Sequence, residues 1–150
     1  MKPCLPFARL LLPWLVMSAV TAFAAGPART LSLTGPAVAR PGSDIQVMVT
    51  ASTDATDGEE IGFFHAEFSA DNGKSWTPVY LEKLGRSASR PVNFQAGADG
   101  TSALVRARIA FRGGKAGDVD YSGGSIVWDG SWGKWSTPPA KIISIPVTTK

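Results

Sequence analysis

The segment "TSALVRARIAF", residues 101–111, has the clearest alternation of apolar and polar side chains in this chain. Because successive side chains of a β-strand point to opposite faces, the alternation predicts a strand with one buried face. The buried face would carry Val105, Ala107, Ile109 and Phe111, and the other face Leu104, Arg106, Arg108 and Ala110. Arg106 and Arg108 are two residues apart, so both side chains should leave the strand on the outward face.

Short segments of the same kind occur on both sides of this strand, and turn residues separate them. We predict further strands in "TLSLTG" (30–35), "PGSDIQVMVTAS" (41–52), "IGFFHAEFSA" (61–70), "WTPVYLEKL" (76–84), "RPVNFQAG" (90–97) and "AKIISIPV" (140–147). Pro91 indicates an edge strand, because proline cannot donate a ladder hydrogen bond. In the last strand Ile143, Ile145 and Val147 form the expected inner face. About seven short strands without an amphipathic helix predict an all-β protein, an antiparallel β-sandwich, with a small barrel as the main alternative.

The N-terminal residues have the composition of a secretory signal peptide. Lys2 and Arg9 are followed by the apolar run "LLLPWLVMSAV", which is short for a membrane span. The sequence "AFA" at 22–24 then matches the small-residue pattern that a signal peptidase cleaves. We therefore predict a signal peptide over residues 1–24 and a single secreted or periplasmic domain over residues 25–150, a combination typical of bacteria.

Removal of this segment changes both the cysteine content and the charge. Cys4 is the only cysteine, so the secreted chain would contain no disulfide, thiolate nucleophile or cysteine metal site. Lys2 and Arg9 are two of 15 Lys and Arg residues, which leaves 13 against 12 Asp and Glu. A nearly neutral domain lacks the concentrated positive patch of nucleic-acid-binding proteins. We therefore expect no nucleic-acid partner, and no membrane span once the signal is removed.

The dense turn motif "SADNGKSW" (69–76) lies between two predicted strands. Asn72 and Gly73 tolerate positive φ angles, and Asp71 can accept hydrogen bonds from turn amides. The spacing of Ser69, Asp71, Gly73 and Trp76 resembles the Asp-box of sialidase-type propellers. A propeller would repeat the motif once per blade, whereas this chain has it once, so we interpret it as a structural turn.

A second dense motif, "GSWGKWSTPP" (130–139), comes ahead of the last predicted strand. Within it, residues 132–136 (Trp-Gly-Lys-Trp-Ser) resemble the W-S-x-W-S box of class I cytokine receptors. The resemblance implies a fibronectin type III or immunoglobulin-like sandwich, in which the tryptophans stack with arginines of the preceding strand. In this chain the structural ladder would consist of Arg106, Arg108, Trp132 and Trp135. Gly133 stands in place of the first serine, and the resemblance covers mainly residues 103–147, so it bears on the fold and carries over no cytokine binding.

The glycine-rich segment "DVDYSGGSIVWDGSW" (118–132) is the candidate ligand-binding loop. It places Tyr121, Trp128 and Trp132 close in sequence to three carboxylates, those of Asp118, Asp120 and Asp129. Aromatic faces beside carboxylates suit a carbohydrate, and aromatic side chains also dominate the hot spots of protein interfaces. The alternative is a hairpin that packs these rings against the edge of the sandwich.

Catalytic and metal-binding patterns are absent. His65 is the only histidine and is expected on a strand surface, and the sequence has no G-x-S-x-G elbow. The acidic segment "DATDGEE" (54–60) offers oxygen ligands but lacks the spacing of an EF-hand, so we predict neither a metal site nor a cofactor. We expect an exported, non-enzymatic binding module that recognises a glycan or a protein partner through the loop before the last strand. The alternative is a structural or assembly domain, or an accessory subunit of a larger exported complex.

Overall fold

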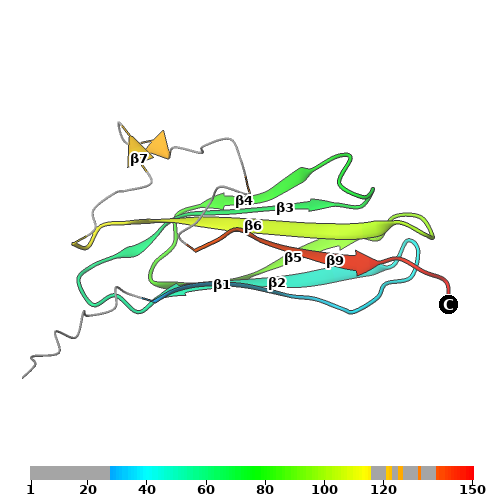
Figure 1. Cartoon of the computed structure of the whole chain (residues 1–150), viewed down its shortest axis with the longest axis horizontal. Coiled ribbons are helices and arrows are strands. Elements are labelled where there is room, and N and C mark those ends of the chain that lie inside the picture. Colours follow the sequence, from blue (N-terminus) through cyan, green and yellow to red (C-terminus); the bar gives the residue numbers. More distant parts are fainter. Residues whose placement is uncertain (1–27, 116–120, 123–124, 127–131, 133–137) are drawn as a thin grey trace, which may run out of the picture.

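The chain folds into two antiparallel β-sheets packed face to face (Figure 1). The computed structural model describes residues 28–115, 121–122, 125–126, 132 and 138–150. One sheet has the order β1-β2-β5, with β1 (Arg29–Thr34), β2 (Asp44–Thr53) and β5 (Ser87–Gln95). The other has the order β4-β3-β6-β9, with β4 (Thr77–Glu82), β3 (Glu60–Ser69), β6 (Ser102–Arg112) and β9 (Lys141–Pro146). These seven strands confirm the predicted antiparallel β-sandwich.

A short third pair, β7 (Tyr121–Ser122) with β8 (Ser125–Ile126), lies in the connection between β6 and β9. β5 is longer than the segment predicted from sequence, because it begins at Ser87. The edge position predicted from Pro91 is right, since β5 is the outermost strand of its sheet.

The core lies between the inner faces of the two sheets, and β6 supplies its largest continuous row. Val105, Ala107, Ile109 and Phe111 are fully buried, which is the face that the alternation predicts. β2 contributes Ile45, Val47, Val49 and Ala51 from the opposite sheet, and β9 contributes Ile145. Burial of apolar area on both sheets drives their association, at about 25 cal/mol per Å².

A buried ion pair joins the beginning of β1 to the loop before β3. Arg29 donates two hydrogen bonds to the Glu59 carboxylate, at 3.0 and 2.5 Å, and Thr53 donates a third at 2.7 Å. The Arg29 guanidinium also lies 4.8 Å from the centre of the Phe111 ring. These hydrogen bonds lower the pKa of Glu59, against the opposing effect of burial, and the carboxylate therefore stays ionised.

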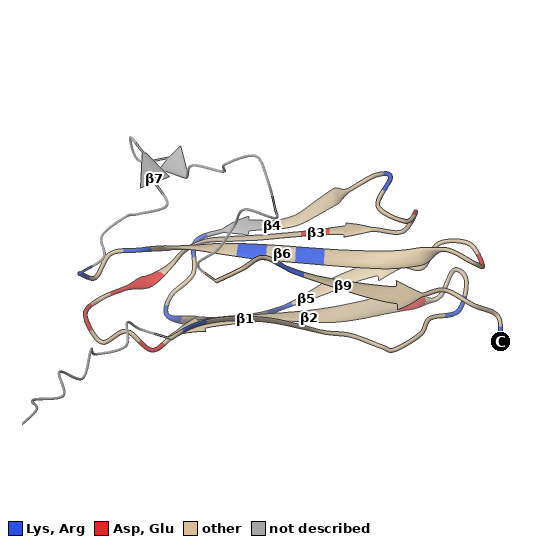
Figure 2. Cartoon of the chain, viewed as in Figure 1, with Lys and Arg blue, Asp and Glu red and all other residues tan. Residues whose placement is uncertain are grey.

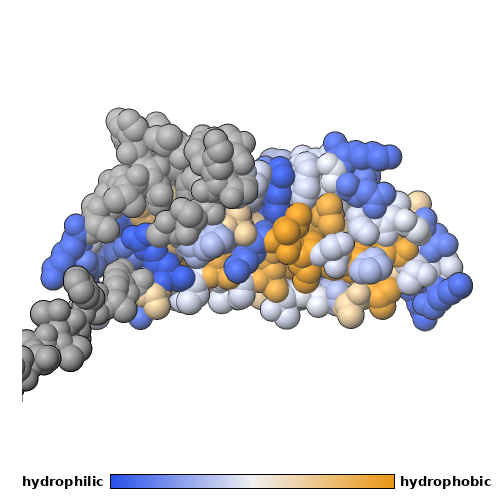
Figure 3. Space-filling view, viewed as in Figure 1, coloured by the Kyte–Doolittle hydropathy of each residue, from blue (hydrophilic) through white to orange (hydrophobic). Residues whose placement is uncertain are grey.

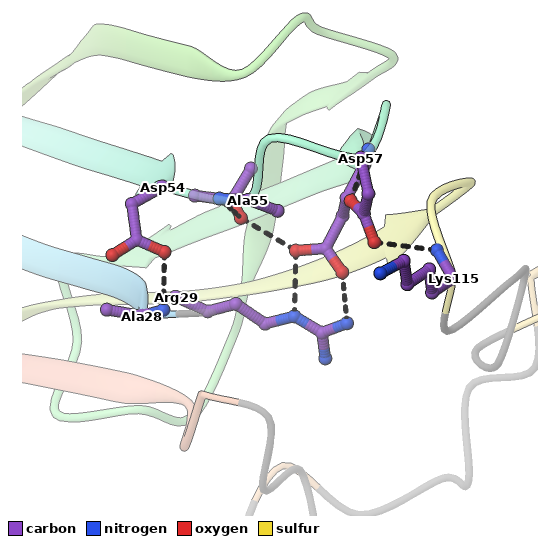
Figure 4. Close-up of polar contacts among 8 residues, drawn as sticks. Ala28, Arg29, Asp54, Ala55, Asp57 and Lys115 are labelled. Atoms are coloured by element: carbon purple, nitrogen blue, oxygen red, sulfur yellow. Dashed lines mark hydrogen bonds and ion pairs between the residues drawn. The ribbon is translucent and has the colours of Figure 1, made fainter. Parts of the chain in front are cut away.

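The same end of the sandwich is closed by further contacts of the acidic loop (Figure 4). Asp54 accepts a hydrogen bond from the Ala28 backbone N–H at 2.6 Å, and Asp57 accepts one from the Lys115 N–H at 2.7 Å. The Lys115 N–H is also the main reason that the pKa of Asp57 is lowered. The carboxylates of the acidic loop therefore bind the segment before β1 and the segment after β6.

The turn between β3 and β4 is held by its own side chains. Ser69 Oγ donates to Asp71 Oδ1 at 2.7 Å and accepts the Gly73 N–H at 2.9 Å. Asp71 also accepts the Ser75 N–H at 2.9 Å and the Ser75 hydroxyl at 2.6 Å, and these bonds hold the pKa of Asp71 far below its usual range. Asn72 and Gly73 have φ angles of 62° and 79°, the left-handed region that such a turn requires.

Candidate functional site

The outward face of the four-stranded sheet carries a ladder of alternating arginine and tryptophan side chains. The guanidinium carbon of Arg106 lies 4.4 Å from the centre of the Trp132 ring, and that of Arg108 lies 4.2 Å from it. Arg106 lies closer still to Trp76, at 3.8 Å. A guanidinium on an indole face contributes about 0.5–1 kcal/mol when exposed and more when desolvated.

The register of β3 and β6 sets which groups meet on this face. Glu67 is opposite Arg106, and His65 is opposite Arg108. Arg106 donates from Nε and Nη2 to Glu67 Oε2, at 2.8 and 2.6 Å, and Figure 2 shows basic residues midway along β6. Arg108 Nε donates to His65 Nδ1 at 3.2 Å, and His65 Nε2 lies 2.9 Å from Glu67 Oε1. An imidazole that accepts at Nδ1 and donates at Nε2 to the carboxylate is the neutral tautomer.

His65 is buried, with 7% of its surface exposed, so the predicted surface histidine is wrong in this respect. The residue does point to the outward face, but the Trp132 ring covers it at a centroid separation of 4.9 Å. Burial lowers the pKa of His65; Glu67 opposes this effect and the Arg108 charge adds to it. Both ring nitrogens face partners, and therefore His65 belongs to a packed hydrogen-bond network with Glu67 and Arg108.

A pocket of about 200 Å³ opens beside the ladder, between Trp132 and the edge strand β9. It is lined by Arg106, Trp132, Ala140, Lys141 and Ile142. In the pairing of β6 with β9, Ile142 is opposite Arg106, and 63% of the Ile142 surface is exposed. Figure 3 shows hydrophobic side chains gathered along the side of the molecule that carries β9. The pocket thus combines an indole, an exposed aliphatic side chain and two cations.

The residues expected at functional positions are distributed unevenly over the described part of the chain. Trp132 is half-buried and lies in the ladder with Arg106 and Arg108. The backbone of Tyr121 belongs to β7. Trp128 and Trp135, together with Asp118, Asp120 and Asp129, lie outside the described residues.

The contact of Trp76 with Arg106 and the position of Ile142 in the pocket were not predicted from the sequence. Trp76 belongs to the predicted turn motif, and its contact with Arg106 depends on a strand register that the sequence does not state. Ile142 had a usable signal in the sequence. It is apolar but lies on the outward face of its strand, whereas Ile143 and Ile145 lie on the inner face. An apolar residue out of phase with a strand's buried face is a candidate contact residue.

Among residues 28–115, 138–150 and the short described segments between them, no three His, Cys, Asp or Glu side chains are grouped as metal ligands. In the same residues no helix has the length and apolar character needed to cross a bilayer. No protein-family model and no curated protein sequence matches this chain.

Proposed function

We propose that this chain is an exported, non-enzymatic binding module that recognises a protein partner through the pocket beside Trp132. The observation that carries the proposal is the pairing of this pocket with Ile142, a large aliphatic side chain that is 63% exposed on an edge strand. Most large aliphatic side chains of the sandwich are instead in its core. Together with the indole of Trp132 and the pocket between them, the exposed Ile142 side chain favours a contact surface.

The chemistry of the lining favours a protein over a glycan. Tryptophan and arginine are the residue types most enriched in the hot spots of protein interfaces. The carboxylates that a sugar would use are missing from the described lining. Glu67, which contacts the lining residue Arg106, already accepts two hydrogen bonds from it. Lys141 adds a cation at the rim, so an acidic side chain beside an apolar one on the partner would fit this surface.

An immunoglobulin-like or fibronectin type III-like assignment is part of the proposal. The strand order supports it: β1-β2-β5 and β3-β6-β9 correspond to the two sheets of an immunoglobulin constant domain, and only β4 differs by joining the second sheet. The Arg106, Arg108 and Trp132 stack agrees with the ladder that the W-S-x-W-S-like box implies. Export rests on the signal-like sequence of residues 1–24.

A structural or assembly domain, or an accessory subunit of a larger exported complex, is the second candidate. The observation in its favour is that Trp132 is half-buried and contacts Arg106, Arg108 and His65 of its own sheet. In this case the indole stabilises the fold and contributes little to recognition.

Site-specific photo-crosslinking in cells that naturally make the protein tests the proposal. A benzophenone amino acid at Ile142 should give one adduct of defined mass, and Lys141→Glu should reduce its yield by reversing the rim charge. Val38 is the matched control, because it is the other exposed large hydrophobic residue of the described chain, at 50%, and does not line the pocket. The same adducts from both positions, or none from position 142, would count against the proposal.

A further inference from the structure

The opposite sheet has a larger pocket, of about 430 Å³, on its outward face. It is lined by Asp44, Ile45, Gln46, Asn93, Phe94 and Gln95, which lie where β2 begins and β5 ends. Its volume falls within the range of about 300–1,000 Å³ that is common for small-molecule sites. Trp132 and β9 take no part in it, so this pocket is separate from the surface proposed above.

The register of β2 and β5 assembles the polar lining. Asp44 is opposite Gln95 and Gln46 is opposite Asn93, so four polar side chains form two adjacent cross-strand pairs. The intervening residues Ile45 and Phe94 are buried on the inner face, at 2% and 8% exposure. Core packing of Ile45 and Phe94 fixes the backbone of both strands, and therefore fixes the positions of the polar side chains between them.

One hydrogen bond joins two of the lining side chains. Gln46 Nε2 donates to Asn93 Oδ1 at 3.0 Å, and both side chains are exposed. A side-chain amide can take part in about four hydrogen bonds, so each of these amides retains capacity for a ligand. The pair would present the carbonyl of Gln46 and the amino group of Asn93 to that ligand as one acceptor and one donor.

The surrounding face has almost no charge, in contrast to the ladder face of the other sheet. Along the strands of this sheet the outward positions beyond the pocket alternate through Thr30, Ser32, Thr34, Met48, Thr50, Ser52, Ser87, Ser89 and Pro91. Asp44 is the one ionisable side chain among the outward positions of β1, β2 and β5. Figure 2 shows β1 and β2 uncoloured by charge except near their ends. Hydroxyl pairs such as Thr50 with Ser89, at 3.1 Å, continue the polar surface from the pocket along the strands.

We propose that this pocket binds a neutral oligosaccharide. Amide groups both donate to and accept from the hydroxyl groups of a sugar, and the Asp44 carboxylate accepts from them. The array of hydroxyl side chains extends that contact for further sugar units. No cation lines the pocket, and the Asp44 carboxylate repels anions, so charged polysaccharides and nucleic acids are disfavoured. The glycan expected at the aromatic loop is thus reassigned to the β1-β2-β5 sheet.

Isothermal titration calorimetry of the purified protein with five neutral hexasaccharides tests this site. The probes are cellohexaose, xylohexaose, mannohexaose, maltohexaose and hexa-N-acetylchitohexaose, with a sulfated oligosaccharide as the anionic comparison. At least one neutral sugar should bind saturably, and Gln46→Ala and Asn93→Ala should each weaken it about tenfold by removing amide hydrogen bonds. Trp132→Phe, on the other sheet and outside this pocket, should leave the affinity unchanged.

The variants Gln46→Glu and Asn93→Asp keep side-chain shape, and they should weaken binding if the alanine variants fail to fold. Silence toward all five neutral sugars overturns the proposal. So does binding that Trp132→Phe abolishes while Asn93→Ala does not, since the sugar would then occupy the ladder side. Concentration-dependent dimers in sedimentation that Asn93→Ala dissociates would assign the pocket to a second copy of the chain instead.

Discussion

The Arg106 guanidinium carbon lies 3.8 Å from the centre of the Trp76 ring, although the two residues belong to separate sequence motifs. Trp76 ends the Asp-box-like turn, and Arg106 belongs to β6, which contacts Trp132, the first residue of the W-S-x-W-S-like box. Because Arg106 also contacts Trp132 at 4.4 Å, one arginine connects the two motifs. The turn and the long connection before β9 are therefore anchored at the same point of the sheet.

Replacement of Arg106 by lysine should destabilise the protein although it conserves charge. A lysine loses the planar stack on the two indoles and the two-pronged hydrogen bond to Glu67, for a cost of about 1–2 kcal/mol. Urea denaturation followed by far-UV circular dichroism measures the free energy of unfolding. Arg112→Lys is the matched control, because Arg112 pairs with Glu60 at 3.1 Å on an exposed site and should change stability by less than about 0.5 kcal/mol. Equal losses in both variants would show that the indole stacks contribute nothing.

The two neighbouring glutamates Glu59 and Glu60 should differ sharply in their effect on stability. Glu59→Gln removes the charge that Arg29 needs, in a pair whose side chains are 11% and 2% exposed, and should cost about 3 kcal/mol. Glu60→Gln weakens a pair that is more than a third exposed on both sides, and should cost at most about 1 kcal/mol. Thermal unfolding of the two variants at neutral pH compares them directly. A small effect of Glu59→Gln would mean that the pair at the sandwich end is dispensable.

Gly97 is a position where the backbone leaves no room for a side chain. A Cβ there would lie 2.1 Å from the Ala70 carbonyl oxygen and 2.9 Å from Thr101 Oγ1. Gly97→Ala should therefore shift the loop against the β3–β4 turn and cost about 1–3 kcal/mol. Gly85→Ala has open space around the new methyl group and should be neutral or slightly stabilising, by about 0.4–1 kcal/mol. Equal shifts of the denaturation midpoint in the two variants would contradict the packing argument.

The β-sandwich was predictable because the signals for its strands lie within each short segment of sequence. The buried row of β6 and the edge position of Pro91 follow from alternation and from the missing proline N–H, and both are confirmed. The contacts of the candidate sites are not local. Glu67 with Arg106, and Gln46 with Asn93, depend on strand registers that the segments do not specify individually.

His65 illustrates the second limit, because alternation gives the direction of a side chain and not its exposure. The pattern correctly placed His65 on the face opposite the core, together with Glu67. Trp132, which is distant in sequence, covers the His65 ring, and no local feature of the β3 sequence predicts this contact. A residue on an outward face is exposed only when nothing from elsewhere in the chain packs over it.

The buried histidine should make the protein less stable in mild acid. Burial lowers the pKa of His65 below its ordinary value of about 6.5, and the groups facing the ring are Glu67 from β3, Arg106 and Arg108 from β6, and Trp132. Near and below pH 6.5 the unfolded chain thus binds a proton that the folded chain resists, so the free energy of unfolding falls as pH is lowered through this window. Stability from this source is fully present above the unfolded pKa and is lost once the pH has passed below the folded one.

Urea denaturation at about pH 7.5 and about pH 5.5 measures this loss, within the range where an ordinary histidine titrates. His65→Gln should show a smaller difference between the two conditions, because glutamine does not titrate. The carboxyl groups with lowered pKa values, Asp57, Glu59 and Asp71, lose their contribution at still lower pH and do not obscure the comparison. Since His65 is the only histidine, its imidazole resonance reports its protonation without overlap from other histidines. A titration midpoint above that of a free histidine would contradict the prediction, because the neutral ring would then not be the form that the ladder stabilises.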